Sequence, residues 1–241
     1  MMRLDKFLCA CRVGTRSEVK KYIRQSLVTV NGQTAAKPED KVDESSDSIC
    51  FRGKPLQYEQ YRYYLLHKPA GCVTAVTDAT HQTVMDLFPA DIRGGLSPVG
   101  RLDRDTEGLL LITNDGEFTH HILSPSHHIP KTYLAELDYA LPEDAVARFK
   151  EGLDIGDEDL TLPAELELLD PYIHENGYVR HRALVTIHEG RYHQVKRMFH
   201  AVGCKVLYLK RLSIGNLTLD GLGSGDFRRL TEQELADLRG L

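Results

Sequence analysis

Several features that would assign this sequence to a membrane, a secretory pathway or a disulfide-rich class are missing. None of its apolar runs approaches the roughly 18 residues that cross a bilayer. The N-terminal Met-Met-Arg-Leu-Asp-Lys has no apolar signal-peptide core, so secretion is not expected. The five cysteines are an odd number without CxxC spacing, which predicts reduced thiols in a cytoplasmic protein.

Motifs for nucleotide cofactors and metals are also missing. Neither GxGxxG nor GxxxxGK[ST] occurs, so nucleotide-cofactor folds lose their main support. Histidine pairs stand at 120–121 and 127–128, and His193 and His200 are seven residues apart, but none has Cys or carboxylate partners at ligand spacing. We therefore expect no metal site.

The charge balance is uneven along the 241 residues. The formal net charge of −5 argues against a nucleic-acid partner. Residues 1–56 carry a net charge of +4, however, and the remainder carries −9. This asymmetry predicts a small anion-binding module attached to a larger acidic body.

The basic N-terminal segment, residues 1–56, has the pattern of two helices followed by a β-hairpin. Apolar residues at 4, 7, 8 and 11 predict a first helix, which Gly14 is expected to end. Thr15 and Glu18 have the spacing of a capping box for a second helix. The run 27–30 followed by Asn31-Gly32 predicts a β-hairpin, and 47–51 predicts another strand. A basic second helix is a plausible phosphate-binding face, although such a charge run by itself is more often a solvated surface.

The ordered segments Arg3–Leu8, Thr15–Glu18 and Val28–Gly32 resemble the small RNA-binding domain first described in the fourth protein of the small ribosomal subunit, here the S-four-like domain. The resemblance spans residues 2 to about 48. It implies an RNA surface at or near these residues: Arg3, Lys6, Arg16, Ser17, Lys20 and Arg24.

The remainder of the chain predicts a mixed α+β domain. Residues 57–62 are polar and aperiodic, so we expect domains at 1–56 and 63–241 with a linker at 57–62. Strands are expected at 63–66, 109–113, 131–137, 183–187 and 205–209, and helices at 83–87, 117–123, 143–152 and 193–202. A capping box at Thr231–Glu234 predicts a short C-terminal helix. The absence of regular βαβ alternation favours α+β over a doubly wound fold.

Three segments of this body combine charged groups with apolar elements. In Gly100–Gly116 a charged loop with two carboxylates enters an apolar strand, which can hold a reacting group in place. Because Asp103 and Asp105 are two residues apart, only one of them is expected to face a given pocket. Glu189–His200 predicts a basic amphipathic helix, and Lys131-Thr132-Tyr133 begins a strand.

Together with Lys68-Pro69-x-Gly71, these segments resemble the pseudouridine synthases that modify ribosomal RNA, in the branch with an N-terminal S-four-like domain. The resemblance covers roughly residues 2–235. It implies a mixed, largely antiparallel sheet as the catalytic domain. It also implies that the N1–C1′ bond of uridine is cleaved and C5 is joined to C1′, without a cofactor.

The resemblance also implies roles for particular residues. Asp103 matches the essential aspartate, as a nucleophile at C1′ or a base at C2′. Lys196, where the family often has arginine, would stabilise the ionised aspartate. Tyr133 would stack on uracil, and Arg101 would lie beside RNA from which the uridine is extruded. Arg197 is a further expected RNA contact.

Ser124–His128 and Glu189–Phe199 most resemble the branch members that act on small-subunit RNA, which implies uridine 516 of 16S rRNA as the target. Alternatives are a large-subunit (23S) synthase of the same branch, a non-catalytic ribosome-assembly protein and an N-glycoside hydrolase. No dimerisation stripe is evident, so we expect a monomer that binds rRNA and no membrane.

Overall fold

The computed structural model describes residues 1–35 and 37–241. Its contacts divide the chain into a first unit, Met1–Tyr61, and a second unit, Arg62–Leu241. The predicted linker at 57–62 overlaps this division. Residues 57 and 58, predicted as linker, pack within the first unit: the ring centroids of Tyr58 and Phe7 are 5.7 Å apart, and the Gln57 carbonyl lies 3.7 Å from the Cys11 thiol.

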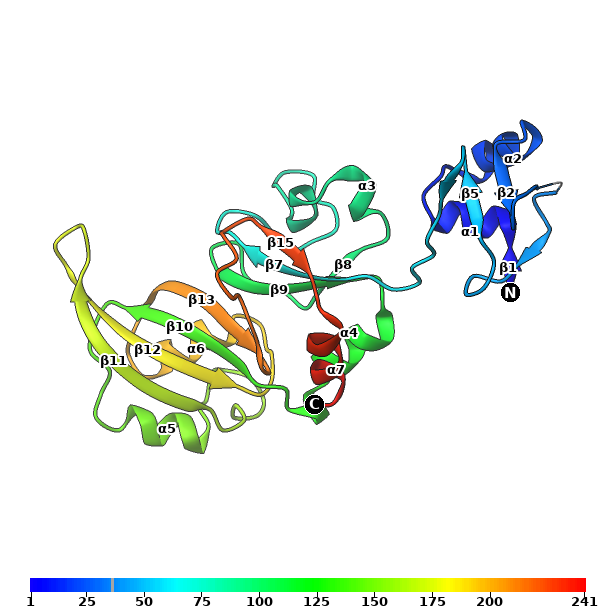
Figure 1. Cartoon of the computed structure of the whole chain (residues 1–241). Helices are drawn as coiled ribbons and strands as arrows, with labels where there is room; N and C mark the ends of the chain where they lie inside the picture. The colour runs from blue at the N-terminus through cyan, green and yellow to red at the C-terminus, as the bar shows by residue number, and fades with distance from the viewer. Residues whose placement is uncertain (36) are drawn as a thin grey trace. The chain divides into compact units, whose positions relative to one another are not determined.

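The first unit combines two helices with short strands (Figure 1). Within the described residues, a four-stranded sheet has the order β3-β2-β5-β6, and β1 pairs with β4. The elements are β1 (Met2–Arg3), α1 (Leu4–Ala10), α2 (Arg16–Arg24), β2 (Val28–Val30), β3 (Gln33–Thr34), β4 (Lys41–Val42), β5 (Ile49–Phe51) and β6 (Lys54–Pro55).

The predicted capping box and hairpin are confirmed. The Thr15 hydroxyl accepts the Glu18 amide, and the Glu18 carboxylate accepts the Thr15 amide at 2.7 Å. Asn31 and Gly32 both adopt positive φ, which matches the twist of a two-residue hairpin between β2 and β3. Helix α1 ends earlier than expected, since Arg12 rather than Gly14 takes the left-handed conformation after it.

The second unit contains a mixed sheet and its covering helices. Its elements are β7 (Tyr63–Lys68), the 3₁₀ helix η1 (Val84–Leu87), α3 (Ala90–Arg93), β8 (Ser97–Val99), β9 (Glu107–Thr113), α4 (Gly116–Leu123), the 3₁₀ helix η2 (Pro125–His127), β10 (Lys131–Leu137), α5 (Ala145–Glu151), β11 (Glu165–Ile173), β12 (Val179–Ile187), α6 (Gln194–Ala201), β13 (Val206–Ile214), β14 (Leu217–Thr218), β15 (Phe227–Arg229) and α7 (Glu232–Arg239). The capping box predicted at Thr231–Glu234 begins α7.

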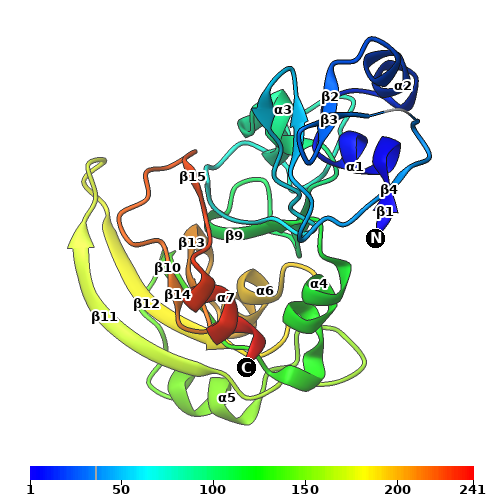
Figure 2. The ribbon, with the colours of Figure 1, turned by 45° about the vertical axis from the view of Figure 1, so that its right-hand side comes forward.

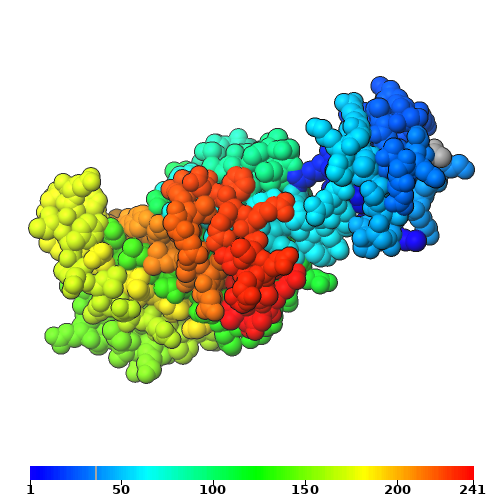
Figure 3. All heavy atoms as spheres, viewed as in Figure 1, coloured from blue at the N-terminus to red at the C-terminus, as the bar shows by residue number. Residues whose placement is uncertain are grey.

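The described strands of this unit form one sheet of order β11-β12-β10-β13-β9-β7-β15, with β8 beside β9 and β14 beside β13. Helices α5 and α6 pack on one face, where Phe149 and Phe199 join the core around Tyr133. Helices α4 and α7 lie side by side on the other face of β7 and β9 (Figure 2), where Phe118 and Leu238 pack on Leu109. In the space-filling view, β15 and α7 form part of the outer surface of this unit (Figure 3).

Strand β9 is buried on both faces, which explains its unbroken apolar sequence. Leu109 and Leu111 point into the core under α4 and α7, whereas Leu110 and Ile112 join the core on the α5 and α6 side. A strand covered on both sides has no need of polar alternation. The loop that precedes β9 therefore begins from a rigid, central element.

Strands β9 and β13 join the two halves of the sheet. These two strands run parallel, whereas the other paired strands described in this sheet are antiparallel. Their pairing is short and consists of Glu107 opposite Lys210 and Gly108 opposite Arg211. Gly108 has φ +108°, and a Cβ there would lie 2.2 Å from the Arg211 carbonyl oxygen. The close approach of the two backbones thus requires glycine at this position.

Gly108→Ala is expected to lower the free energy of unfolding by about 3 kcal/mol or more, because the methyl group meets backbone and φ is strained. Denaturant unfolding followed by circular dichroism measures the change. Gly116→Ala is the control, since a Cβ there meets nothing within 4 Å. Equal unfolding midpoints for the two variants would contradict the constraint.

Most predicted elements are present, and the sheet is largely antiparallel as expected. Strand β10 has the predicted bounds, whereas β12 and β13 extend beyond theirs and 84–87 is a 3₁₀ helix. Strand β11 was not predicted. It is an edge strand with mostly exposed side chains and a proline at 171, and a register shift between Leu169 and Tyr172 accommodates that proline.

Candidate active site

The loop between β8 and β9 carries Asp103 and is tied down on both sides of it. The Thr74 hydroxyl donates to the Leu102 carbonyl at 2.7 Å and accepts the Leu102 amide at 3.2 Å. On the other side, the Thr106 amide donates to the Asp103 carbonyl at 3.1 Å. The Asp103 backbone is therefore held between two fixed points.

Lys68, at the end of β7, secures the same loop from within. Its side chain is fully buried, and its Nζ donates to the carbonyls of Thr106 at 2.8 Å, Pro69 at 3.0 Å and Arg104 at 3.3 Å. Burial lowers the pKa of this ammonium group. The sequence indicated Lys68 as part of a motif, but its contact with the loop depends on the tertiary structure.

Both loop carboxylates reach one cation on α6. The Lys196 Nζ lies 3.0 Å from Asp103 Oδ2 and 2.6 Å from Asp105 Oδ1. The expectation that the two aspartates face apart was wrong. Residues 103–106 form a turn rather than a strand, so the alternation of side chains does not apply.

The three charged groups differ in exposure. The Asp103 and Lys196 side chains are 24% and 26% exposed, whereas Asp105 is 74% exposed. Partial burial opposes ionisation of Asp105, but the hydrogen bond and charge of Lys196 outweigh it and lower the Asp105 pKa. Burial likewise opposes the charge on Lys196, and hydrogen bonds to Asp105 and Asp103 outweigh it and raise the Lys196 pKa. Lys196 therefore stays protonated at neutral pH.

His193 is a second side-chain partner of Asp103, and it was not predicted. Its Nε2 lies 3.2 Å from Asp103 Oδ1. It caps α6 in the left-handed conformation, with φ +49° and ψ +32°. A non-glycine residue in this region stores strain that is typical of functional sites. The signal in the sequence was its position three residues before Lys196, in the segment that was expected to open a helix.

Tyr133 lies in β10, is 7% exposed and is held by Arg211 of β13. The Arg211 Nη1 donates to the Tyr133 hydroxyl at 3.3 Å, and the guanidinium lies 5.9 Å from the ring centroid. Arg211 also donates through Nε to the Leu109 carbonyl of β9 at 2.7 Å. One buried side chain thus connects the tyrosine strand with the strand that follows the Asp103 loop.

Arg211 was also not predicted. Its signal in the sequence was one of two adjacent basic residues in a largely apolar strand, and a surface position explains such residues equally well. It is 4% exposed, and its Nη2 has no hydrogen-bond partner among the described residues.

The structure places the predicted RNA-contacting residues in different surroundings. All six of the first unit are exposed, and so is Arg101 of the second unit. Arg3 forms a bidentate pair with Asp5, at 2.8 and 3.0 Å. Arg16, Lys20 and Arg24 recur every four residues along α2 and therefore share one face.

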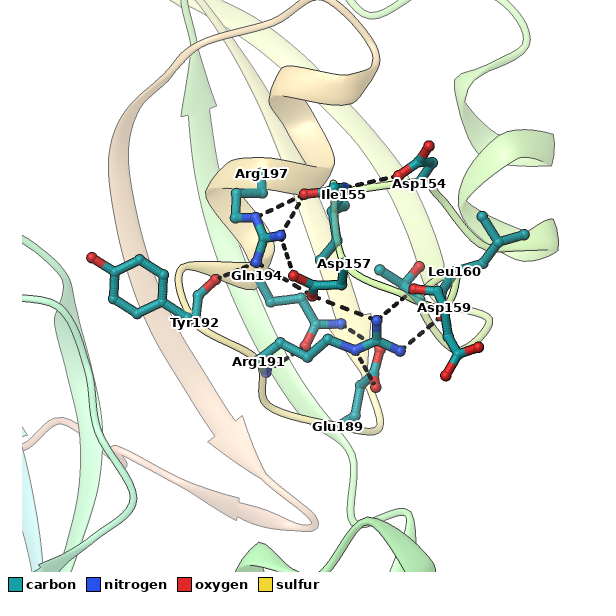
Figure 4. Close-up of polar contacts among 12 residues, drawn as sticks. Asp154, Ile155, Asp157, Asp159, Leu160, Glu189, Arg191, Tyr192, Gln194 and Arg197 are labelled. Carbon is teal, nitrogen blue, oxygen red and sulfur yellow. Dashed lines mark hydrogen bonds and ion pairs between the residues drawn. The ribbon is translucent and has the colours of Figure 1, made fainter.

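Arg197, also predicted to contact RNA, points toward the loop at 155–157 (Figure 4). Its guanidinium donates to the Ile155 carbonyl at 2.9 and 2.5 Å, to Asp157 at 2.5 Å and to the Tyr192 carbonyl at 3.0 Å. The hydrogen bond from Arg197 lowers the Asp157 pKa. In the structure, Arg197 of α6 holds the loop that follows α5 through these hydrogen bonds.

Arg191 makes a parallel set of contacts in the same view (Figure 4). It pairs with Glu189 at 2.9 Å and donates to the carbonyls of Asp159 and Leu160, each at 2.7 Å. Gln194 also donates to Glu189, at 2.8 Å. The segment 189–197 is therefore a rigid scaffold that presents His193 and Lys196 to Asp103.

Within residues 1–35 and 37–241, no group of three or more His, Cys, Asp or Glu side chains is arranged to hold a metal ion. The five cysteines all lie in these ranges and are free thiols. Over the same ranges, no helix combines the length and apolar character that a bilayer crossing requires.

Comparison with known families agrees with this architecture. The RNA pseudouridylate synthase family matches residues 62–201, and the S4 domain family matches residues 2–49. The chain belongs to the RNA pseudouridine synthases, and its N-terminal domain is an S4 domain. It is an RNA-binding isomerase, as the motifs predicted.

Individual relatives extend the similarity over nearly the whole chain. Ribosomal small subunit pseudouridine synthase A of Haemophilus influenzae is 43% identical and covers 98% of this chain and 99% of that protein. An uncharacterized RNA pseudouridine synthase of Bacillus subtilis, YtzG, is 41% identical and covers 97% of each. A crystal structure of a pseudouridylate synthase superposes with a TM-score of 0.67 at 40% identity, covering 99% of this chain and 100% of that one.

Proposed function

We propose that the chain converts one uridine of small-subunit ribosomal RNA to pseudouridine, with Asp103 as the reacting carboxylate. The observation that carries the assignment is the Asp103–Lys196 pair on a loop fixed from both sides. A carboxylate held at 3.0 Å from a cation has a defined direction, which attack on a sugar requires.

Asp103 acts on the ribose of the target nucleotide, as a nucleophile at C1′ or as a base at C2′. Both roles need the ionised carboxylate, and the adjacent ammonium group of Lys196 favours that form. His193 contacts the other carboxylate oxygen and restricts its rotation. The reaction is an isomerisation, so these side chains need to supply only positioning and proton transfer.

Tyr133 supplies an aromatic face to the uracil. Arg211 fixes its hydroxyl and ring, so the ring is positioned before RNA binds. A preorganised aromatic group lowers the entropy lost when the base stacks on it. The target uridine must leave its helix to reach this position, and the exposed Arg101 lies beside the loop that receives it.

The small-subunit target is supported by relatives named for that subunit at 40–43% identity over 98% of the chain. Uridine 516 of 16S rRNA, as the particular position, rests on the resemblance of the sequence motifs. A large-subunit synthase of the same branch is the second candidate. We further propose that the protein acts in the cytoplasm, a reducing compartment in which the five free thiols would persist. The monomeric state stays an expectation from the sequence.

Pseudouridine mapping of rRNA from cells with and without this protein tests the target. One small-subunit pseudouridine is expected to disappear in the deletion strain and to return when the wild-type protein is supplied. Loss of a large-subunit position instead would assign the second candidate. Release of free uracil from RNA, measured by chromatography, would indicate a hydrolase and contradict isomerisation.

The basic face of α2 is expected to supply salt-dependent RNA affinity. Replacing Arg16, Lys20 and Arg24 together by glutamine removes up to three phosphate contacts. The slope of log Kd against log salt should fall by roughly 2 to 3, with the largest loss of affinity at low salt, because each contact releases counterions. Filter binding between low and physiological salt measures both quantities.

The control replaces three exposed lysines outside this face, Lys54, Lys150 and Lys205, by glutamine. The net charge changes equally, but the α2 face stays intact. If both triple variants show the same salt slope, overall charge rather than the α2 face determines the affinity.

A further inference from the structure

Tyr192 is a large aromatic side chain left open to solvent beside the candidate active site. It is 77% exposed, and Figure 4 shows its ring extending away from the contacts around Arg197. Burial of such a ring would normally contribute to stability, so the fold gains little from this one. Its exposure therefore calls for an explanation outside the packing of the chain.

One face of the Tyr192 ring is stacked on His193. The two ring centroids are 3.8 Å apart with an interplanar angle of 18°. His193 in turn contacts Asp103 at 3.2 Å. His193 thus contacts both the Tyr192 ring, whose other face is open, and the candidate catalytic carboxylate of Asp103.

The backbone below this pair is rigid. Arg197 donates to the Tyr192 carbonyl at 3.0 Å, and His193 is locked in the left-handed conformation at the start of α6. Two rotatable bonds orient the tyrosine ring, and its contact with His193 restricts them further. An exposed aromatic surface that is already ordered loses little entropy when a ligand stacks on it.

We infer that the stacked Tyr192–His193 pair is a binding platform for a nucleobase next to the target uridine in the RNA chain. This inference rests on the proposed function of Asp103. Bases of single-stranded RNA stack on aromatic side chains, and successive stacked bases are spaced roughly 3.4 Å apart. Because adjacent nucleotides are joined by one phosphodiester, a neighbour of a uridine held at Asp103 lies near His193 and its stacked partner Tyr192.

The platform also offsets part of the cost of base extrusion. When the target uridine leaves its helix, the adjacent base loses a stacking partner. The Tyr192 ring replaces that partner, and its uncharged face accepts any of the four bases. The pair therefore contributes affinity at a flanking position without dictating which base stands there.

The test uses the full-length protein and a synthetic RNA hairpin of the rRNA sequence around the mapped uridine. Tyr192→Ala is expected to raise Kd about tenfold. On RNA in which one flanking nucleotide is abasic, the same substitution should change Kd less than about twofold, because the stacked base is already missing. Tyr192→Phe keeps the ring and should restore the wild-type Kd on intact RNA.

The matched control is Tyr178→Ala, at the turn of the β11–β12 hairpin, where the tyrosine is 73% exposed. It should leave Kd unchanged on every RNA. Two RNAs are compared, one abasic on the 5′ side of the target uridine and one on the 3′ side. The platform is overturned if Tyr192→Ala keeps its full effect on both of these RNAs, or if it has no effect on intact RNA. If the wild-type protein binds the hairpin but forms no pseudouridine in it, the proposed function is contradicted. The platform is tested separately, by the ratio of variant to wild-type Kd on intact and abasic RNA.

Discussion

Asp103→Asn is expected to abolish pseudouridine formation, by about 10⁴-fold or more, while RNA binding stays near that of the wild type. The amide has the shape of the carboxylate but neither its charge nor its basicity. The variant should also fold normally, since Lys196 keeps Asp105 as a partner at 2.6 Å. Mass spectrometry of digested RNA measures turnover, and filter binding measures affinity.

Asp105→Asn is the matched control, because Asp105 lies in the same loop and contacts the same lysine. Its carboxylate is 74% exposed, and its loss leaves the Asp103–Lys196 pair intact. We expect it to reduce turnover by less than about tenfold, in line with the small energy of exposed ion pairs. Equal turnover by wild type and Asp103→Asn would exclude Asp103 as the reacting group.

Lys196→Met is expected to lower turnover by about 10²- to 10³-fold, the range found when one preorganised electrostatic partner is removed. Without the ammonium group, the carboxylates of Asp103 and Asp105 repel each other and lose their shared hydrogen-bond donor. Single-turnover kinetics on RNA carrying the target uridine separate this effect from binding. Wild-type turnover in Lys196→Met would show that the ion pair has no part in the reaction.

Lys196→Arg provides the conservative counterpart. The guanidinium keeps the positive charge and can bind both carboxylates in a forked geometry. Because charge at this position is what favours the ionised aspartate, we expect this variant to keep most of the wild-type turnover. A loss as large as that of Lys196→Met would mean that the compact ammonium group itself is required.

Local patterns in the sequence were sufficient for the elements that depend on local chemistry. The capping box at Thr15–Glu18 and the hairpin at Asn31-Gly32 appear in the structure as predicted, because hydrogen bonds and backbone conformations within a few residues create them. Edge strand β11 lacked such a signal. Its pairing with β12 comes from the rest of the sheet.

The candidate site divides in the same way. Motif order placed Asp103, Tyr133 and Lys196 in one family pattern, and the 3.0 Å approach of Asp103 and Lys196 agrees with that pattern. The error concerned Asp105, whose direction depends on a turn rather than on strand alternation. Arg197 is a second case in which the sequence was insufficient. The sequence shows that a cation stands at this position but not that the guanidinium donates to the loop at 155–157.

The sequence by itself determined the S4 domain, the pseudouridine synthase class and the residue types of the site, because ordered motifs and local hydrogen bonds are written along the chain. Only the tertiary structure decided the contacts of Lys68, Arg211 and His193, which join segments far apart in sequence. Buried charges and strained backbone depend on what packs around them, and that information exists only once the sheet has assembled.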